Sequence, residues 1–261
     1  MARPDRLTRT EVVRRLRAAG CVAAEEEADE LLRAAAGPEQ LSTMLARRVE
    51  GEPLAWIVGS VLFCDVRVLV DPGVYVPRWQ SEPLVRRGAA RLRDGGRAVD
   101  LCTGSGALAL ALKSFAPLAH VVGTEIDEVA CACARSNGVE VYEGELDSAL
   151  PCEFEGTIDL VIGVVPYVPS GELEFLPRDV LDYEPRVALD GGLDGTEFLR
   201  RALVCASGLL RDGGVLLLEL GGEEDVVIRP ALAESGFAAV ESILDGDGDL
   251  RGIEAVRTRS R

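Results

Sequence analysis

Histidine is almost absent from this chain of 261 residues, in which His120 is the only example. One histidine leaves little material for a nucleophile triad or a zinc site. The seven cysteines are scattered and odd in number, and no two of them have the Cys-x-x-Cys spacing of zinc and redox motifs. We therefore expect no metal site. We expect the cysteines to be small buried side chains in a reducing cytoplasm.

Long apolar runs are also missing. No run reaches the roughly 18 residues that a membrane-spanning helix needs. The first six residues, Met-Ala-Arg-Pro-Asp-Arg, are not followed by the apolar core of a signal peptide. The expectation is a cytoplasmic protein with no membrane partner.

Positive charge is in short supply. The chain has 28 Lys and Arg against 44 Asp and Glu, which gives a formal net charge of -16. Residues 1–50 contain nine basic and nine acidic residues, so the whole excess of acid lies in residues 51–261. Affinity for nucleic acids depends largely on neutralisation of phosphates by Lys and Arg, and we therefore expect no nucleic-acid partner.

Hydrophobic spacing divides the chain into two parts. Residues 8–50 have helical spacing and are broken at Gly20 and Gly37, which predicts about three short helices. Residues 61–76 are rich in β-branched side chains and are interrupted by Asp-Pro-Gly at 71–73, which predicts a hairpin.

From residue 97 onward strand and helix patterns alternate, which predicts an α/β fold with a mainly parallel sheet covered on both faces. The predicted strands are residues 98–101, 120–124, 139–142, 158–163, 215–220, 238–244 and 252–256. The predicted helices are residues 107–114, 128–137 and 196–210.

The first of these strands runs into a glycine-rich loop, Cys-Thr-Gly-Ser-Gly at 102–106, and a helix is predicted to begin directly after it. Glycines allow such a loop to turn tightly and to approach a ligand closely at a helix N-terminus. The pattern is ambiguous, because Gly104-x-Gly106-x-x-Ala109 also fits the dinucleotide fingerprint.

Two carboxylates follow the next strands. Glu125 ends the second strand, about twenty residues after the glycine loop, where an acid can accept from both ribose hydroxyls. Glu145 ends the third strand and is placed to accept from an adenine amino group, while Leu146 packs on the ring. These loops share one edge of the sheet and predict a nucleoside site, which suits both S-adenosylmethionine and NAD.

The fourth strand is followed by Val164-Val165-Pro166-Tyr167. A Pro-Tyr pair directly after a buried strand fixes a rigid turn and sets a phenol ring at the edge of the sheet. An NAD-dependent oxidoreductase fits the glycine loop but leaves this segment without a role.

Three motifs make the chain similar to a known family. Residues 100–107 (Asp-Leu-Cys-Thr-Gly-Ser-Gly-Ala), 165–169 (Val-Pro-Tyr-Val-Pro) and 183–195 (Tyr-Glu-Pro-Arg-Val-Ala-Leu-Asp-Gly-Gly-Leu-Asp-Gly) resemble the HemK/PrmC family. The resemblance covers about residues 50–258, in order and with matching spacing. Members of that family transfer a methyl group from S-adenosylmethionine to the glutamine side-chain amide of release factors, and a related branch acts on a ribosomal protein.

The resemblance implies a class I S-adenosylmethionine-dependent methyltransferase fold, Rossmann-like, with a seven-stranded, mostly parallel sheet. It implies a helical substrate-recognition domain over residues 1–58, a β-hairpin linker over 59–80 and a methyltransferase domain over 81–261. The residues implied to hold S-adenosylmethionine are Asp100, Cys102, Thr103, Gly104, Ser105, Gly106, Glu125, Ile126, Glu145, Leu146 and Val164. The implied catalytic residues are Val165, Pro166 and Tyr167, and the substrate is expected to contact Val164, Val165, Pro166, Tyr167, Trp79 and Glu184.

The chain departs from the family's Asn-Pro-Pro-Tyr signature at its first two positions, where it has Val164 and Val165. In the family the Asn side-chain oxygen and the next backbone carbonyl accept the two hydrogens of the target amide. Val164 has no acceptor, and an unpaired buried donor costs roughly 1–3 kcal/mol. The carbonyl of Val165 and the ring of Tyr167 remain, and Cys102 stands in place of the first loop glycine.

Two alternatives to a glutamine-bearing protein substrate stay open. A guanidinium is also planar and rich in N–H donors, and it would need acidic partners, which are frequent near the motifs: Glu82, Asp147, Glu172, Glu174, Asp182 and Glu184. The acceptor is then a guanidine-type amino acid or another small amine. The other alternative is an adapter that binds the cofactor without catalysis.

Overall fold

The computed structural model describes residues 7–222 and 224–258. Residues 1–6, on which the signal-peptide expectation falls, lie outside the described residues. Within the described part of the chain, no helix is both long enough and apolar enough to cross a membrane.

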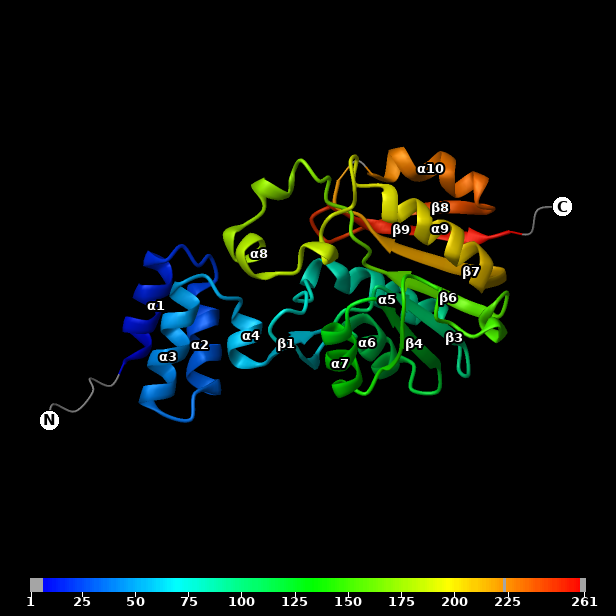
Figure 1. The fold of residues 1–261 in the computed structure, drawn as a ribbon. Coiled ribbons are helices and arrows are strands. Elements are labelled where there is room, and N and C mark those ends of the chain that lie inside the picture. Colours follow the sequence, from blue (N-terminus) through cyan, green and yellow to red (C-terminus); the bar gives the residue numbers. More distant parts are fainter. Residues whose placement is uncertain (1–6, 223, 259–261) are drawn as a thin grey trace, which may run out of the picture.

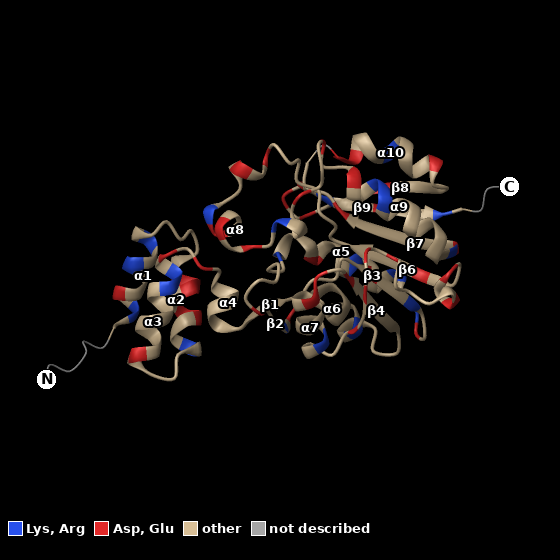
Figure 2. Ribbon diagram, viewed as in Figure 1, with Lys and Arg blue, Asp and Glu red and all other residues tan. Residues whose placement is uncertain are grey.

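The N-terminal part is a small bundle of helices (Figure 1). It contains α1 (Arg9–Ala18), α2 (Ala24–Ala34) and α3 (Pro38–Val49), followed by the short α4 (Leu54–Val58). The three predicted helices are therefore confirmed. Their apolar faces form one hydrophobic cluster, and the ion pair of Arg48 with Glu27 (2.6 Å) ties α3 to α2. Acidic and basic residues are both spread over the helices of the bundle (Figure 2), as expected from its balanced charge.

A hairpin follows, but its turn is not where the sequence predicted it. The paired strands are β1 (Ser60–Phe63) and β2 (Val66–Leu69), joined by Cys64 and Asp65. Both turn residues have positive φ, 48° and 62°, which is the geometry of the tight turns that match strand twist. A turn does form at residues 71–73, closed by a hydrogen bond from the Val74 amide to the Asp71 carbonyl (3.1 Å), but it follows the hairpin instead of joining its strands. The hairpin turn itself was missed because a Cys-Asp pair carries no glycine to signal it.

The rest of the chain confirms the predicted α/β class. Seven strands form one sheet in the order β5-β4-β3-β6-β7-β9-β8, and all neighbours pair in parallel except β9, which is antiparallel to both β7 and β8. The strands are β3 (Arg97–Leu101), β4 (His120–Glu125), β5 (Glu140–Glu143), β6 (Ile158–Gly163), β7 (Leu210–Glu219), β8 (Phe237–Leu244) and β9 (Leu250–Arg257).

Helices cover both faces of this sheet (Figure 1). One face packs against α5 (Glu82–Arg91), α6 (Ala107–Phe115) and α7 (Glu128–Ser136), and the other against α9 (Glu197–Leu209) and α10 (Glu224–Glu234). Side chains alternate between the two cores, as period-two strands require: Leu160 and Ile162 face one, and Val161 faces the other.

A long segment leaves β6 and returns to α9, and it contains the 3₁₀ turns η3 (Leu173–Phe175) and η4 (Arg186–Ala188) and the helix α8 (Arg178–Tyr183). It reaches back to the helical bundle. The ring of Tyr183 meets that of Trp56 edge-on at 6.2 Å, and its hydroxyl donates to the carbonyl of Glu50 (3.4 Å). The segment that follows the Pro-Tyr motif therefore bridges the sheet and the bundle.

Candidate active site

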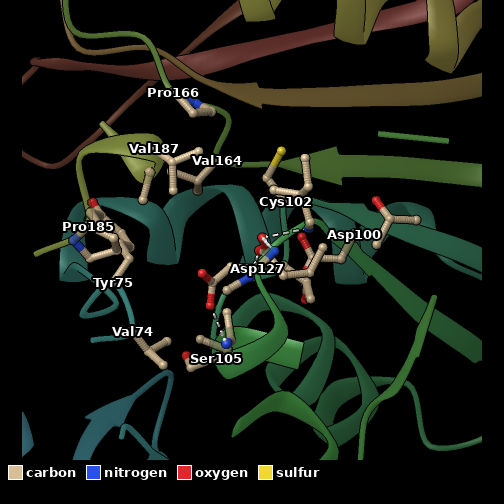
Figure 3. A pocket seen from close by; sticks show the side chains of 18 of the residues that line it. Val74, Tyr75, Asp100, Cys102, Ser105, Asp127, Val164, Pro166, Pro185 and Val187 are labelled. Carbon is tan, nitrogen blue, oxygen red and sulfur yellow. Dashed lines mark hydrogen bonds between the residues drawn. The ribbon is translucent and has the colours of Figure 1, made fainter. Parts of the chain in front are cut away.

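A pocket opens at the carboxyl edge of the sheet, where β3, β4, β5 and β6 end (Figure 3). This is the edge at which open α/β sheets bind ligands. The pocket brings together eleven of the predicted site residues: Asp100, Cys102, Thr103, Gly104, Ser105, Glu125, Ile126, Glu145, Leu146, Val164 and Pro166.

The loop after β3 has the tight geometry expected of it. Gly104 and Gly106 have φ of 57° and 81°, and Cys102, in place of a glycine, has φ of 55°. Gly106 does not line the pocket but caps α6, and a Cβ there would lie 2.8 Å from Cγ2 of Val139. Glycine is therefore required at 106 by both backbone conformation and space.

Asp100 stabilises the conformation of this loop through side-chain hydrogen bonds. Its side chain is buried, with 1% of the residue exposed, and its Oδ2 accepts from the Thr103 hydroxyl (2.6 Å) and the Ala109 amide (3.2 Å). Burial raises the pKa of Asp100 to about 7, against the opposing effect of these two donors.

Glu125 ends β4 as predicted, and it lines the pocket. Oε2 accepts from the Gly104 amide (2.9 Å), and Oε1 accepts from the amides of Ile126 (2.8 Å) and Asp127 (3.0 Å). Each carboxylate oxygen has two acceptor positions, so capacity for a ligand hydroxyl remains.

Glu145 and Leu146 line the pocket, but not from the end of a strand. The predicted strand end was wrong, since β5 stops at Glu143 and Leu146 has φ of 50°. The Glu145 carboxylate pairs with Arg201 (2.7 Å), and this hydrogen bond lowers its pKa. Arg201 also lies over the ring of Phe198, 5.1 Å from its centroid, and Phe198 itself lines the pocket.

The Val-Val-Pro-Tyr segment contributes to the pocket at alternate positions. Val164 and Pro166 line it (Figure 3), whereas Val165 is 1% exposed and belongs to the hydrophobic core. Tyr167 is also outside the lining, and its hydroxyl donates to Oε1 of Glu219 (3.2 Å). The hydroxyl of Tyr167 is therefore engaged by a buried carboxylate, and the stacking of its ring on an acceptor stays a prediction.

Trp79 and Glu184 also lie outside the pocket lining, and their contact with the substrate stays a prediction. Trp79 is 59% exposed, and the guanidinium of Arg251 lies 5.2 Å from the centroid of its ring. Glu184 is buried in an ion pair with Arg78, and burial raises its pKa to about 7 while Arg78 opposes the rise. A carboxylate engaged in this way is not free to receive a cationic substrate.

The acids that suggested a guanidinium acceptor are likewise engaged elsewhere or exposed. Glu82 accepts from the Cys64 amide (3.0 Å) and Asp182 pairs with Arg178 (3.3 Å). None of the six is among the described residues that line the pocket. The guanidine alternative thus loses one of the two observations on which it depended, and only Val164 remains.

Several lining residues were missed from the sequence. They come from the segment after the hairpin, from α6 and α7, from the ends of β4 and β5, and from the segment around η4 and α9: Gly73, Val74, Tyr75, Pro77, Ser81, Ala107, Leu108, Thr124, Asp127, Ala130, Gly144, Pro185, Val187, Ala188 and Phe198. A signal existed for two of these groups, since residues 74–78 and 183–195 are among those that resemble the family. No local pattern marks Asp127, Ala130 or Phe198.

The pocket is equipped for a polar ligand. The hydroxyls of Ser105 and Thr124 are buried in its wall and, within the described part of the chain, have no hydrogen-bond partner. Buried polar groups are rarely left unpaired, so these two hydroxyls are positions where a bound molecule would be expected to pair. Together with Glu125 they fit a nucleoside-containing cofactor.

Comparison with known proteins identifies the class and the family. No protein-family model matches the chain. A release factor glutamine methyltransferase of Geobacter sulfurreducens is 35% identical over 220 residues, covering 81% of this chain and 76% of that protein. A 4-amino-L-phenylalanine/4-methylamino-L-phenylalanine methyltransferase of Streptomyces pristinaespiralis is 37% identical over 238 residues, covering 81% of each. The crystal structure of a methyltransferase from Pyrococcus furiosus superposes with a TM-score of 0.52 at 24% identity, covering 74% of this chain and 90% of that one.

The sheet order and the pocket define a class I methyltransferase that uses S-adenosylmethionine. The chain belongs to the HemK/PrmC family, that of the release factor glutamine methyltransferases, and it is an N-methyltransferase.

Proposed function

We propose that S-adenosylmethionine lies along the glycine loop, with a ribose hydroxyl at Glu125 and its adenine between Glu145 and Leu146. Three observations support this placement: the positive φ of Gly104, the strand-end position of Glu125, and the unpartnered hydroxyl of Ser105 in the same wall. The cofactor supplies a methyl group that is already activated on a sulfonium. The protein's own part is to align the acceptor nitrogen and to exclude water.

We propose further that the acceptor is the side-chain amide nitrogen of a glutamine in a protein of the release-factor type. The observation that carries this proposal is the 35% identity over four fifths of the chain with a protein named release factor glutamine methyltransferase. The helical bundle supports it, because α8 joins the bundle to the loop that contributes Pro185 and Val187 to the pocket. A protein substrate that touches the bundle would thus lie close to the reacting centre.

Val164 is expected to slow methyl transfer to glutamine. The pocket wall has a valine side chain where an amide-holding acceptor is expected, so one hydrogen of the glutamine amide goes unpaired there. An unpaired donor costs roughly 1–3 kcal/mol, which corresponds to about ten- to a hundredfold in rate if it is felt in the transition state. Slow transfer to glutamine is therefore the expectation.

One observation favours a second candidate, an aromatic amine on a small amino acid. The wall around Val164 is apolar, with Pro166, Pro185 and Val187 beside it (Figure 3). An arylamine is uncharged at neutral pH and has a lone pair available without any acceptor to orient it. The 37% identical relative from Streptomyces pristinaespiralis is named for such a substrate.

A transfer assay with methyl-labelled S-adenosylmethionine distinguishes the candidates. Release factors, arylamine amino acids and free arginine are offered separately, and the products are read by mass spectrometry. The proposal expects label on a glutamine side chain of the protein substrate. Label on the arylamine alone replaces it with the second candidate, and label on arginine alone contradicts both.

We propose the cytoplasm as the place of action. All seven cysteines are free, including Cys131 and Cys133, which are only two positions apart. Free thiols in this number suit a reducing compartment. Retention of the activity and of all seven free thiols in a glutathione buffer would support this, and a disulfide needed for activity would contradict it.

A further inference from the structure

Glu219 is the last residue of β7 and lies at the same edge of the sheet as the pocket. Its neighbour Leu218 pairs in register with Gly163, the last residue of β6, so Glu219 stands beside the start of the Val-Val-Pro-Tyr segment. The residue is 3% exposed, and it was not among the predicted site residues. Buried carboxylates are costly unless their oxygens are hydrogen-bonded, so its partners show what its burial serves.

The two oxygens of Glu219 join two different walls of the active site. Oε1 accepts from the Tyr167 hydroxyl (3.2 Å), on the segment that contributes Val164 and Pro166 to the pocket. Oε2 accepts from the hydroxyl of Ser81, which lines the pocket from the segment ahead of α5. Burial raises the pKa of Glu219, and both hydroxyl donors oppose the rise.

Three glycines pack closely against the ring and the backbone of Tyr167. A Cβ at Gly221 would lie 2.9 Å from Cε2 of the ring, and one at Gly195 would lie 2.3 Å from the Tyr167 carbonyl oxygen. A Cβ at Gly191 would lie 2.7 Å from Cα of Tyr167. Glycines therefore pack against the ring and the main chain, and Glu219 anchors the remaining end of the side chain.

We propose that Glu219 is a positioning residue for methyl transfer, which fixes the acceptor wall through Tyr167 and the cofactor wall through Ser81. The inference rests on methyl transfer in this pocket and holds for either acceptor nitrogen. The proposal predicts two separate effects, one on the acceptor and one on the cofactor, which a purely structural role of Glu219 would not produce separately. Loss of the Tyr167 arm misplaces the acceptor, and loss of the Ser81 arm loosens the cofactor.

The test measures kcat with the acceptor that the wild type methylates, and the S-adenosylmethionine Kd by calorimetry. Tyr167→Phe keeps the ring and is expected to lower kcat about tenfold with Kd unchanged within about twofold, since small misplacements near the reacting atoms have effects of this size or more. Ser81→Ala is expected to raise Kd about fivefold with little change in kcat. Glu219→Ala shows both effects, and Glu219→Gln, whose amide oxygen still accepts one hydroxyl, recovers part of each.

Glu254 provides a matched control. It is a buried carboxylate of the same sheet, on β9, and it pairs with Arg87 (2.5 Å) and Arg91 (2.6 Å) of α5 rather than with the pocket segments. Glu254→Gln is expected to lower Tm without the separate changes in kcat and in the S-adenosylmethionine Kd. The inference is overturned if Glu219→Ala changes both constants by less than twofold, or if Glu254→Gln lowers kcat as much at equal loss of Tm. If no acceptor is methylated, the proposed function fails, while the Kd arm still tests the Ser81–Glu219 link.

Discussion

The guanidinium of Arg78 lies against the buried carboxylate of Glu184 and joins two segments that are 106 residues apart. Arg78 follows Tyr75 and Pro77, and Glu184 precedes Pro185, and these three neighbours all line the pocket. The ion pair therefore holds together two segments that line the pocket. A residue that the sequence suggested as a substrate contact acts here as a structural link.

Removal of the cation from this pair is expected to cost more than removal of the anion. Arg78→Met leaves a buried carboxylate without its partner, which costs about 3–5 kcal/mol, whereas Glu184→Gln leaves only a partly exposed guanidinium. The free energy of unfolding from urea titration measures both. The control is Arg178→Met, which breaks an exposed pair with Asp182 and is expected to change stability by less than about 0.5 kcal/mol. Equal losses in the free energy of unfolding for Arg78→Met and Arg178→Met would contradict the role of Arg78 as the partner of a buried carboxylate.

Gly106→Ala is expected to destabilise the cofactor loop through a clash. The added methyl would meet Val139 at 2.8 Å, in a residue whose φ is already 81°. Gly138→Ala is the matched control, because its φ is 75° but nothing lies within 4 Å of the new methyl. Backbone strain alone costs about 1 kcal/mol in either variant, so the difference in Tm and in cofactor affinity isolates the contact. If both variants lose the same amount of Tm and of cofactor affinity, the contact with Val139 is not the reason why residue 106 is a glycine.

Asp100 is expected to make stability fall as pH rises toward neutral. Its pKa is about 7 in the folded state, above the value of 3.8 for a free side chain, so the folded state holds the proton over the pH range between these values. The stability that Asp100 contributes is complete below pH 4 and is lost as pH rises through 7, by a few kcal/mol in total. Asp100→Asn removes this loss.

Denaturation of wild type and Asp100→Asn at pH 5 and pH 8 checks this dependence. All other titrating groups are common to the two proteins, so the difference between them reports on Asp100. The variant's advantage is expected to be larger at pH 8. A difference that is the same at both pH values would show that Asp100 ionises normally.

The fold was largely predictable because its central strands are buried on both faces. Residues 158–163 match β6 at both ends, since the run contains four large apolar residues and only one charged residue, Asp159. The helices α5 and α10 were missed because each contains a residue that normally interrupts helices, Gly88 and Pro230. Gly88 is explained by packing, because a Cβ there would lie 3.1 Å from Leu160.

The site was predictable only where a residue follows a strand end. Glu125 and Val164 lie where the topology of parallel strands places them. The partners of Glu184 and Tyr167 were not predictable, because Arg78 and Glu219 are distant in sequence and no spacing connects them. Those contacts depend on how irregular segments fold back over the sheet edge.

Val164→Asn is expected to raise transfer to glutamine about ten- to a hundredfold. The new side-chain oxygen supplies the acceptor that the amide otherwise lacks. Val187→Asn is the matched control, since Val187 also lines the pocket but comes from η4 rather than from the end of β6. A kcat for glutamine that rises equally in both variants, or in neither, would show that residue 164 does not hold the amide.

The most direct test of the central claim is tandem mass spectrometry of a release factor incubated with this enzyme and methyl-labelled S-adenosylmethionine. The account predicts one labelled methyl group on a glutamine side-chain nitrogen, formed slowly by the wild type and faster by Val164→Asn. Cofactor binding by calorimetry with label on no glutamine, whether the label appears on an arylamine or nowhere, would contradict it.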